Sequence, residues 1–160
     1  MKKNLTDIFF MKEVIKLAKK GAKRGDGGPF GAVVVKDNRI IGKGWNKVIA
    51  LNDPTAHAEI IAIRDACANI KSFQLKDCVI YSSCEPCPMC LGAIYWARPQ
   101  KLVYGCTRND AAKIGFDDEF IYKEITKPLS RRKIRTMQMM RKEGCDVLRE
   151  WYNNNDRVRY

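Results

Sequence analysis

The sequence is poor in histidine, since His57 is the only one among 160 residues. It lacks any apolar run near the ~18 residues that a membrane-spanning helix needs, so we expect no membrane contact. Its N-terminus has a basic start but no small-residue cleavage site, which predicts no signal peptide and a cytoplasmic protein. No internal repeat or low-complexity linker divides the chain, and its length suits one domain around a single core.

Paired cysteines are also lacking, because the chain has seven cysteines, an odd number. An odd count without an export signal argues against a framework of disulfides. We expect four of these cysteines to be reduced thiols that fill core space, as free cysteine packs like a small apolar residue. They are Cys67, Cys78, Cys106 and Cys145.

Acidic residues are scarce at the two ends of the chain. Residues 1–24 contain 8 Lys and Arg against 2 acids, residues 25–122 contain 11 of each, and residues 123–160 contain 11 against 5. The net charge of +12 therefore lies wholly at the ends. Solvated helix faces explain this pattern, and a surface that follows nucleic-acid phosphates would explain it too. Because the central segment is neutral, we expect nucleic acid not to be a partner.

The sole histidine belongs to a spaced motif. It stands in His57-Ala58-Glu59, and Pro86-Cys87-Pro88-Met89-Cys90 follows downstream. A His-x-Glu followed by Pro-Cys-x-x-Cys is typical of zinc-dependent deaminases. Zinc held by one His and two Cys keeps its fourth position open for water, which is the arrangement of a catalytic rather than a structural site. The motif predicts one zinc ion per chain, bound by His57, Cys87 and Cys90.

The apolar periodicity predicts alternating helices and strands. We expect helices over Asp7–Arg24, Pro54–Asn69 and Pro88–Ala97, a hairpin of Phe30–Val35 and Arg39–Gly44, and strands at Cys78–Ser82 and Leu102–Gly105. The alternation over residues 57–105 implies parallel strands joined by helices. Beyond residue 106 we expect a helical turn at Asp110–Lys113, a loop at Gly115–Asp118, a strand or helix at Ile134–Met140, and a last helix around Val147–Trp151.

The predicted layout brings the motif together at two helix N-termini. Their dipoles favour negative charge, which suits two thiolates and a hydroxide. Glu59 would take a proton from the attacking water and return it to the substrate. Each piece alone has another interpretation: Cys-x-x-Cys also occurs in redox pairs and structural zinc sites. Cys84 could add a fourth ligand and close the site to water.

Several segments resemble bacterial guanine deaminases of the cytidine-deaminase-like fold. These segments are residues 27–33, 52–59, 81–99 and 110–128, of which 93–99 and 115–122 are the more specific. The resemblance implies an α/β fold, a three-layer α/β/α sandwich with a five-stranded mixed sheet. It implies one deaminase domain over 1–160 and a homodimer in which the segment 129–160 is exchanged between subunits. Residues 129–150 depart from the family in being strongly basic and rich in methionine.

The resemblance also implies roles for individual residues. Asn46 and the backbone of Ala58 would hydrogen-bond a purine, and Phe30 and Trp96 would give it apolar or stacking surface. Asp118 would be a second proton carrier, and Tyr160 would reach the partner's pocket. Core packing for the two aromatic residues, a turn for Asn46 and a plain loop carboxylate for Asp118 remain open as alternatives.

The sequence thus predicts hydrolytic deamination of guanine to xanthine and ammonia, with attack at C2 and Glu59 serving the ring nitrogen N3. A related deaminase acting on guanosine or on tRNA adenosine is the first alternative, supported by the charged ends. A non-catalytic zinc module that binds nucleic acid is the second, and it requires four protein ligands on the metal.

Overall fold

The computed structural model describes residues 5–116 and 118–159. The chain forms two compact units, of which the first extends to Ile121 and the second begins at Tyr122. Tyr160, for which we predict a role in substrate binding, lies outside the described residues. In the part of the chain that is described, we find no helix with the length and apolar content to cross a membrane.

The first unit begins with the predicted amphipathic helix and hairpin. Helix α1 covers Leu5–Arg24 and buries one face at Phe10, Val14, Ala18 and Gly21. Strands β1 (Gly31–Lys36) and β2 (Arg39–Trp45) pair antiparallel. The two residues between them, Asp37 and Asn38, both have positive φ. Two-residue hairpins with positive φ at both positions favour Asn and Asp there, so the sequence itself selects this turn.

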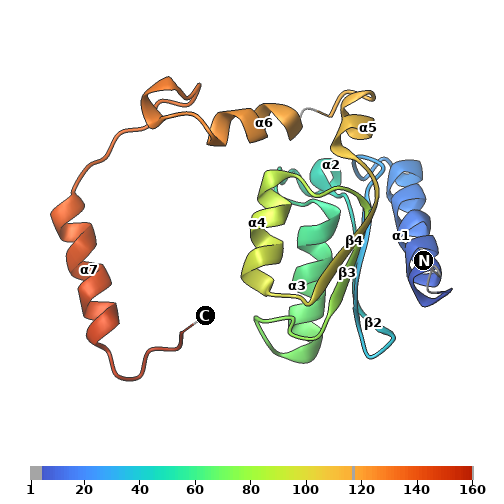
Figure 1. Ribbon diagram of the computed structural model, residues 1–160, viewed down its shortest axis with the longest axis horizontal. Coiled ribbons are helices and arrows are strands. Elements are labelled where there is room, and N and C mark those ends of the chain that lie inside the picture. The colour runs from blue at the N-terminus through green and yellow to red at the C-terminus, as the bar shows by residue number, and fades with distance from the viewer. Residues whose placement is uncertain (1–4, 117, 160) are drawn as a thin grey trace. The chain divides into compact units, whose positions relative to one another are not determined.

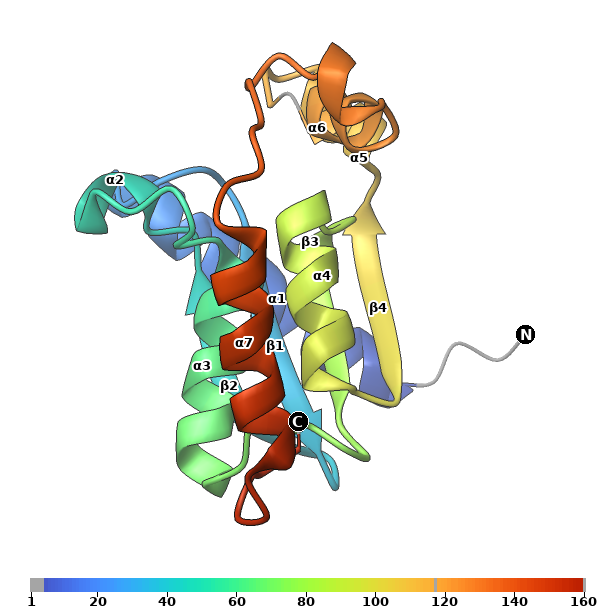
Figure 2. The same cartoon turned by 90° about the vertical axis from the view of Figure 1, so that its left-hand side faces the viewer.

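The sheet has four strands in the order β2-β1-β3-β4. Strand β3 (Val79–Cys84) pairs antiparallel with β1, and β4 (Lys101–Cys106) pairs parallel with β3. Helix α1 covers one face, while α3 (Ala58–Ile70) and α4 (Pro88–Ala97) cover the other (Figures 1 and 2). The predicted α/β class and the parallel pair joined by a helix are confirmed.

The core has one apolar cluster on each face of the sheet. Ala32, Val34 and Ile80 face α3 and α4, whereas Val33, Val35 and Tyr81 face α1. This alternation follows from the period of two along a strand. It explains why β1 is buried along nearly its whole length.

The fifth strand that we predicted is absent from the described residues. Residues 135–140 have no regular structure, and Ile134 and Met137 are 81% and 79% exposed. A strand needs a neighbour to accept its ladder hydrogen bonds, and none of the described segments pairs with this one. Ile134–Met140, predicted as a strand or a helix, therefore forms neither, and the fifth strand implied by the resemblance is not confirmed.

The other corrections concern short helices. A helical turn, α2 (Val48–Leu51), lies between β2 and α3, where no helix was predicted, and α3 begins at Ala58 rather than Pro54. Helix α5 (Arg108–Ala112) confirms the predicted helical turn, and Thr107 and Asp110 form a capping box at its start. Helix α6 (Asp118–Ile125) was not predicted; it has acidic residues in its first turn and a lysine in its last, as the helix dipole favours.

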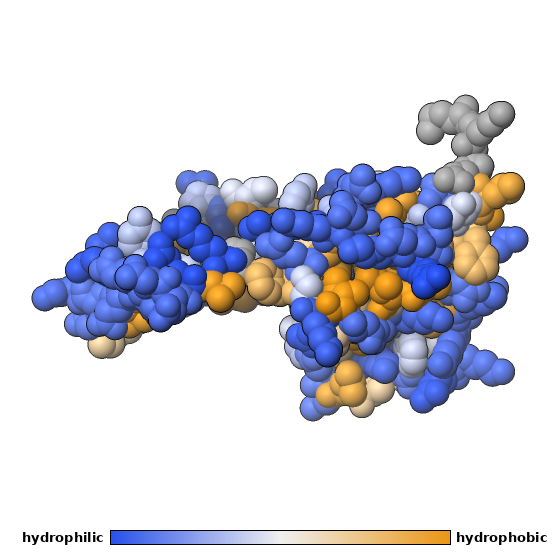
Figure 3. Space-filling model, turned by 90° about the horizontal axis from the view of Figure 1, so that it is seen from below, coloured by the Kyte–Doolittle hydropathy of each residue, from blue (hydrophilic) through white to orange (hydrophobic). Residues whose placement is uncertain are grey.

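The second unit contains a short 3-10 helix at Leu129–Arg131 and the predicted last helix, α7 (Arg141–Asn153). No residue of α7 is buried, although Val147, Leu148, Trp151 and Tyr152 are apolar or aromatic. The first unit also exposes apolar side chains, and Figure 3 shows such atoms gathered on one of its faces. Both units thus present apolar surface that a partner could cover.

Candidate active site

Two helix N-caps bring the motif together. His57 is the N-cap of α3 and Cys87 is the N-cap of α4, both with extended backbone. Helix α3 starts late because Oδ1 of Asp53 accepts hydrogen bonds from the backbone N–H and the hydroxyl of Thr55, which holds residues 53–55 in a turn. Pro88 supplies a first helical residue that needs no N–H partner.

His57, Cys87 and Cys90 form a cluster with the dimensions of a zinc site. Nδ1 of His57 lies 3.5 Å from the sulfur of Cys87 and 3.5 Å from that of Cys90. All three potential ligand atoms lie within 4.8 Å of one another. Tetrahedral zinc with ordinary bond lengths sets its nitrogen and sulfur ligands about 3.6 Å apart. The three residues therefore fit a zinc ion without rearrangement, and they could hold it with one position left over.

Cys84 does not join this cluster. Its thiol donates a hydrogen bond to the carbonyl oxygen of Thr107 at 3.4 Å. Burial raises the pKa of Cys84 to about 11, so it stays a thiol in neutral solution. Among the described residues, the metal-binding group comprises three side chains only. This geometry favours a site open to water over a closed structural site.

The electrostatics of the cluster favour a thiolate. The pKa of Cys87 lies well below its ordinary value, first because the Cys90 thiol donates a hydrogen bond to its sulfur and next because His57 does so. The pKa of His57 is raised, chiefly by its hydrogen bond to Cys87. Cys90 keeps its proton because the neighbouring thiolate and burial both raise its pKa. The hydrogen bonds that stabilise the thiolate in this way are those that a bound divalent cation would replace.

Glu59 is a buried carboxylate beside the cluster. Its side chain is 6% exposed. Oε1 accepts a hydrogen bond from the Ser82 hydroxyl at 2.9 Å, and Oε2 lies 3.5 Å from the sulfur of Cys90. Burial is the main cause that raises the pKa of Glu59. A carboxylate with an elevated pKa at the edge of a metal cluster is suited to accept and release a proton.

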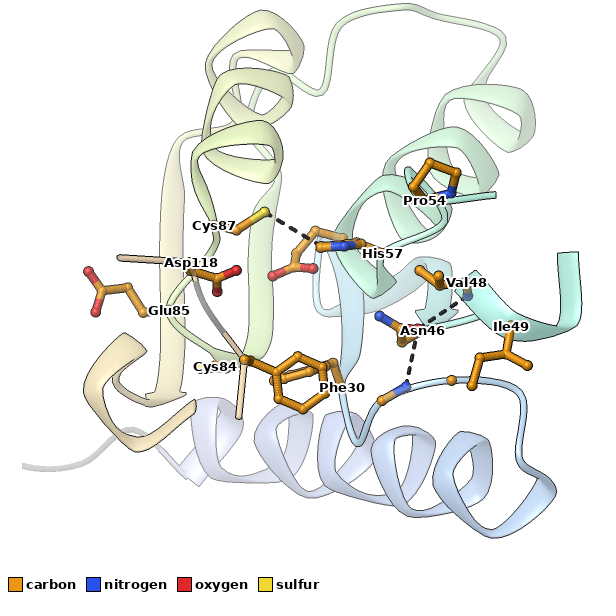
Figure 4. Close-up of a pocket in the computed structure, with 14 residues that line it drawn as sticks. Phe30, Asn46, Val48, Ile49, Pro54, His57, Cys84, Glu85, Cys87 and Asp118 are labelled. Carbon is orange, nitrogen blue, oxygen red and sulfur yellow. Dashed lines mark hydrogen bonds between the residues drawn. The ribbon is translucent and has the colours of Figure 1, made fainter. Parts of the chain in front are cut away.

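The cluster opens into a pocket of about 450 Å³ (Figure 4). Its walls come from the glycine-rich turn before β1, the end of β2, α2, the N-termini of α3 and α4, and the segment before α6. The lining residues are Gly27, Gly28, Phe30, Asn46, Val48, Ile49, Pro54, His57, Glu59, Cys84, Glu85, Cys87, Phe116 and Asp118. The pocket is large enough for a small planar heterocycle.

Asn46 has a fixed orientation in this pocket. It is 4% exposed, and its Oδ1 accepts hydrogen bonds from the backbone N–H groups of Gly28 and Val48, each at 3.2 Å. With the oxygen engaged by the backbone, the amide nitrogen is the group that Asn46 can offer to a ligand (Figure 4). A ligand acceptor such as a carbonyl oxygen or a ring nitrogen matches it.

Two phenylalanine rings form an apolar wall. The Phe30 and Phe116 rings meet edge to face at 4.7 Å. A Cβ atom on Gly28 would lie 2.7 Å from the Phe116 ring and 2.9 Å from the Phe30 ring, so a larger residue at this position would have to displace one of the rings. Asp118 follows Phe116 closely and lines the same pocket, and its charge contributes to the raised pKa of His57.

Not every predicted site residue lies in the pocket. Ala58 is the first residue of α3, with its side chain in the core and its backbone adjacent to His57. Trp96 is 66% exposed on α4 and does not line the pocket of this chain. Sequence reasoning missed Phe116 and Glu85 as lining residues, although both stood inside segments that carried the resemblance.

The sequence pattern of the cytidine and deoxycytidylate deaminase zinc-binding region matches residues 5–106, which include the whole cluster. The chain belongs to this family, and it is a zinc-dependent hydrolytic deaminase.

The similarity extends over nearly the whole chain in guanine deaminase of Bacillus subtilis (strain 168). That protein is 52% identical over 151 residues, 94% of this chain and 97% of its own. Its X-ray structure has a TM-score of 0.92 and covers 95% of this chain and 97% of its own. The predicted membership among guanine deaminases of this fold is confirmed.

More distant relatives include one that is named for another activity. A tRNA-specific adenosine deaminase of Buchnera aphidicola is 39% identical over 155 residues, 96% of this chain and 98% of its own. The protein NE0047, solved in complex with 2,6-diaminopurine, is 30% identical with a TM-score of 0.65, covering 94% of this chain and 83% of its own.

Proposed function

We propose that this chain deaminates guanine, converting it with water into xanthine and ammonia. The observation that carries the proposal is a cluster of three potential metal ligands at the floor of a pocket. A buried carboxylate lies beside the cluster, and the pocket wall presents an amide donor. The relative from B. subtilis, which aligns with this chain over 94% of its residues, is a guanine deaminase. NE0047 was solved with an aminopurine bound.

We assign zinc to His57, Cys87 and Cys90. When bound there, zinc lowers the pKa of a coordinated water toward ~7 and so supplies hydroxide in neutral solution. Glu59 takes the proton of the attacking water on Oε2, the oxygen that faces Cys90, and passes it to ring nitrogen N3 as attack occurs at C2. The second proton of the water, now on the C2 hydroxyl, is taken up by Glu59 and delivered with the help of Asp118 to the departing amine, which leaves as ammonia.

The purine is held by groups with complementary hydrogen bonding. The amide nitrogen of Asn46 donates to an acceptor on the purine, and the backbone of Ala58 at the start of α3 supplies a second polar contact. Phe30, supported by Phe116, gives one apolar wall for the ring. The positive end of the α3 dipole favours the negative charge that develops on the purine during attack.

We further propose a homodimer in which the segment 129–160 is exchanged and Tyr160 closes the partner's pocket. The second unit is supported by little internal packing, and the apolar residues of α7 are exposed. The first unit exposes two consecutive aromatic residues of α4, Tyr95 and Trp96. Apolar surface on both units is consistent with mutual coverage between two copies.

A cytoplasmic location accords with the cysteine chemistry. All seven cysteines are free, and two of them are needed as metal ligands. Such thiols persist in a reducing compartment. Fractionation of the source cells with a cytoplasmic marker tests this proposal.

Turnover of guanine, guanosine and an adenosine-containing tRNA stem-loop by the same preparation tests the substrate. We expect guanine alone to be converted, and its turnover to depend weakly on salt because a neutral base releases no counterions on binding. Deamination of the RNA with steep salt dependence would instead assign the tRNA activity of the Buchnera relative.

Complementation between inactive chains tests the exchange. Removing residues 157–160 should cut guanine turnover while the dimer and its zinc remain. Mixing this truncated chain with a Glu59→Gln chain should restore activity, because the intact tail of one subunit then closes the intact site of the other. Absence of rescue in verified mixed dimers would show that the tail does not act on the partner.

A further inference from the structure

Strand β3 contains a serine where its pattern calls for an apolar residue. Ile80 and Ser82 point to the same face of the sheet, which packs on α3 and α4. Ile80, two residues earlier on the strand, and Ala32, its partner on β1, are both fully buried and apolar. Ser82 itself is 1% exposed. Burying a hydroxyl among apolar groups is unfavourable unless it makes a hydrogen bond, so its partner is informative.

That partner is the carboxylate of Glu59. The Ser82 hydroxyl donates to Oε1 at 2.9 Å, across 23 residues of sequence. Oε2, the other oxygen, faces the metal cluster, 3.5 Å from the sulfur of Cys90. The two oxygens thus have separate surroundings: one contacts the central sheet, and the other faces the position at which water would react.

The support under Ser82 is rigid. Strand β3 lies inside the sheet, paired with β1 on one side and β4 on the other, and Ser82 pairs with Ala32 and Tyr104. Glu59, in contrast, lies in the first turn of α3, and its carboxylate is at the end of a side chain with three rotatable bonds. A hydrogen bond from a fixed strand removes this freedom, and catalysis is sensitive to misplacement of about 1 Å.

We propose that Ser82 is a positioning residue for the reaction: its hydroxyl fixes Oε1 of Glu59 so that Oε2 is held toward the metal site. This inference rests on the proposed role of Glu59 as the proton carrier. Ser82 is not among the residues that line the pocket, and in this arrangement it acts through Glu59.

The adjacent residue provides a matched control. Ser83 lies next to Ser82 on the same strand but points to the opposite face, where its hydroxyl oxygen accepts a hydrogen bond from the backbone N–H of Gly31 at 3.0 Å. Ser83→Ala removes one serine hydroxyl and one hydrogen bond, as Ser82→Ala does, without touching Glu59. The two variants separate a loss of positioning from a loss of strand stability.

The experiment measures kcat and KM for guanine, zinc per chain and the midpoint of unfolding for Ser82→Ala and Ser83→Ala. We expect Ser82→Ala to lower kcat about 10- to 100-fold with KM little changed and zinc retained. Ser83→Ala should keep the wild-type kcat. A crystal structure of Ser82→Ala should show Glu59 in an altered or mixed rotamer. Wild-type kcat for Ser82→Ala would overturn the proposal.

A second pair of variants covers a failure of Ser82→Ala to fold. Ser82→Thr keeps the hydroxyl and Ser82→Val has the same shape without it, so any crowding is equal in both. We expect kcat of the threonine variant to exceed that of the valine variant by the same 10- to 100-fold. Equal kcat values for the two would overturn the proposal.

A double variant separates this inference from the role of Glu59. If Ser82 acts through Glu59, Ser82→Ala should cause no further loss in a Glu59→Gln background. An equal loss in both backgrounds would overturn the positioning role. If Glu59→Gln is inactive and Ser82→Ala is normal, only the inference on Ser82 fails. If Glu59→Gln is fully active, the proposed proton transfer fails and the role of Ser82 fails with it.

Discussion

Replacing Glu59 by glutamine probes the proposed chemistry with the least change in shape. The amide has nearly the volume of the carboxylate, and its oxygen can still accept the hydrogen bond from Ser82. The three residues of the metal cluster are unchanged, so the zinc content should stay at one ion per chain. What is lost is the ability to take a proton and release it again, since an amide does not titrate in water.

The size of the loss follows from this single role. General acid–base catalysis contributes typically ~10²–10⁴-fold, so we expect kcat for guanine to fall by that factor. This corresponds to a rise of about 2.7–5.4 kcal/mol in the activation free energy. The fold should be retained, because burial already disfavours the charged form of Glu59 and a neutral amide carries no such cost.

Ammonia release or the ultraviolet change on xanthine formation measures the turnover, and atomic absorption measures zinc in the same samples. A Glu59→Gln variant with full zinc and a kcat within tenfold of wild type would refute the assigned role. Loss of zinc together with activity would show instead that Glu59 supports the metal cluster, which also contradicts our assignment.

Three further predictions concern the metal, the pocket wall and the fold. Cys84→Ser should keep zinc and activity, whereas Cys87→Ser should lose both; metal loss from the first would indicate a closed site. Gly28→Ala should raise KM and lower the free energy of unfolding by about 1–3 kcal/mol, because the added methyl group overpacks the pocket wall. Gly92→Ala has open space around it and should raise the free energy of unfolding by about 0.5–1 kcal/mol, and equilibrium unfolding measures both changes. Asp7→Asn should lower the free energy of unfolding by about 0.5–1 kcal/mol at pH 7, because the pKa of Asp7 is lowered first by the hydrogen bond from the hydroxyl of the buried tyrosine on β3. This stabilisation by Asp7 is present above pH ~4 and is lost as the pH falls through the folded-state pKa. A difference in stability between variant and wild type that stays constant from about pH 7 to about pH 2 would contradict the prediction.

The local elements of the fold were predictable because local chemistry determines them. The Asp37-Asn38 turn has the positive φ values that the hairpin needs, and the apolar spacing of α1 matches the face that it buries. The start of α3 was not predictable from periodicity. It depends on the side chain of Asp53, which holds Thr55 in a turn and delays the helix until Ala58.

Contacts between distant segments set the limits of sequence reasoning at the site. The fixed orientation of the Asn46 amide depends on two backbone N–H groups that engage its oxygen, one of them 18 residues away. Phe116 enters the pocket through its contact with Phe30, far away in the sequence. Neither relation leaves a local pattern. Ile134–Met140 shows the reverse, because its local pattern suits a strand or a helix and the described structure has neither there.

The metal cluster itself was predictable, and the reason lies in helix ends. In an ideal helix, residues two apart such as His57 and Glu59 point to different sides. His57 is the N-cap, with extended backbone, so its ring is directed by the chain entering the helix, while Glu59 belongs to the first turn. Cys87 and Cys90 repeat this relation as N-cap and third residue of α4. A spacing of two residues, which does not share one face of a helix, is thus compatible with one site at the helix start. For this reason a motif of five positions located the chemistry although the start of α3 was predicted four residues too early.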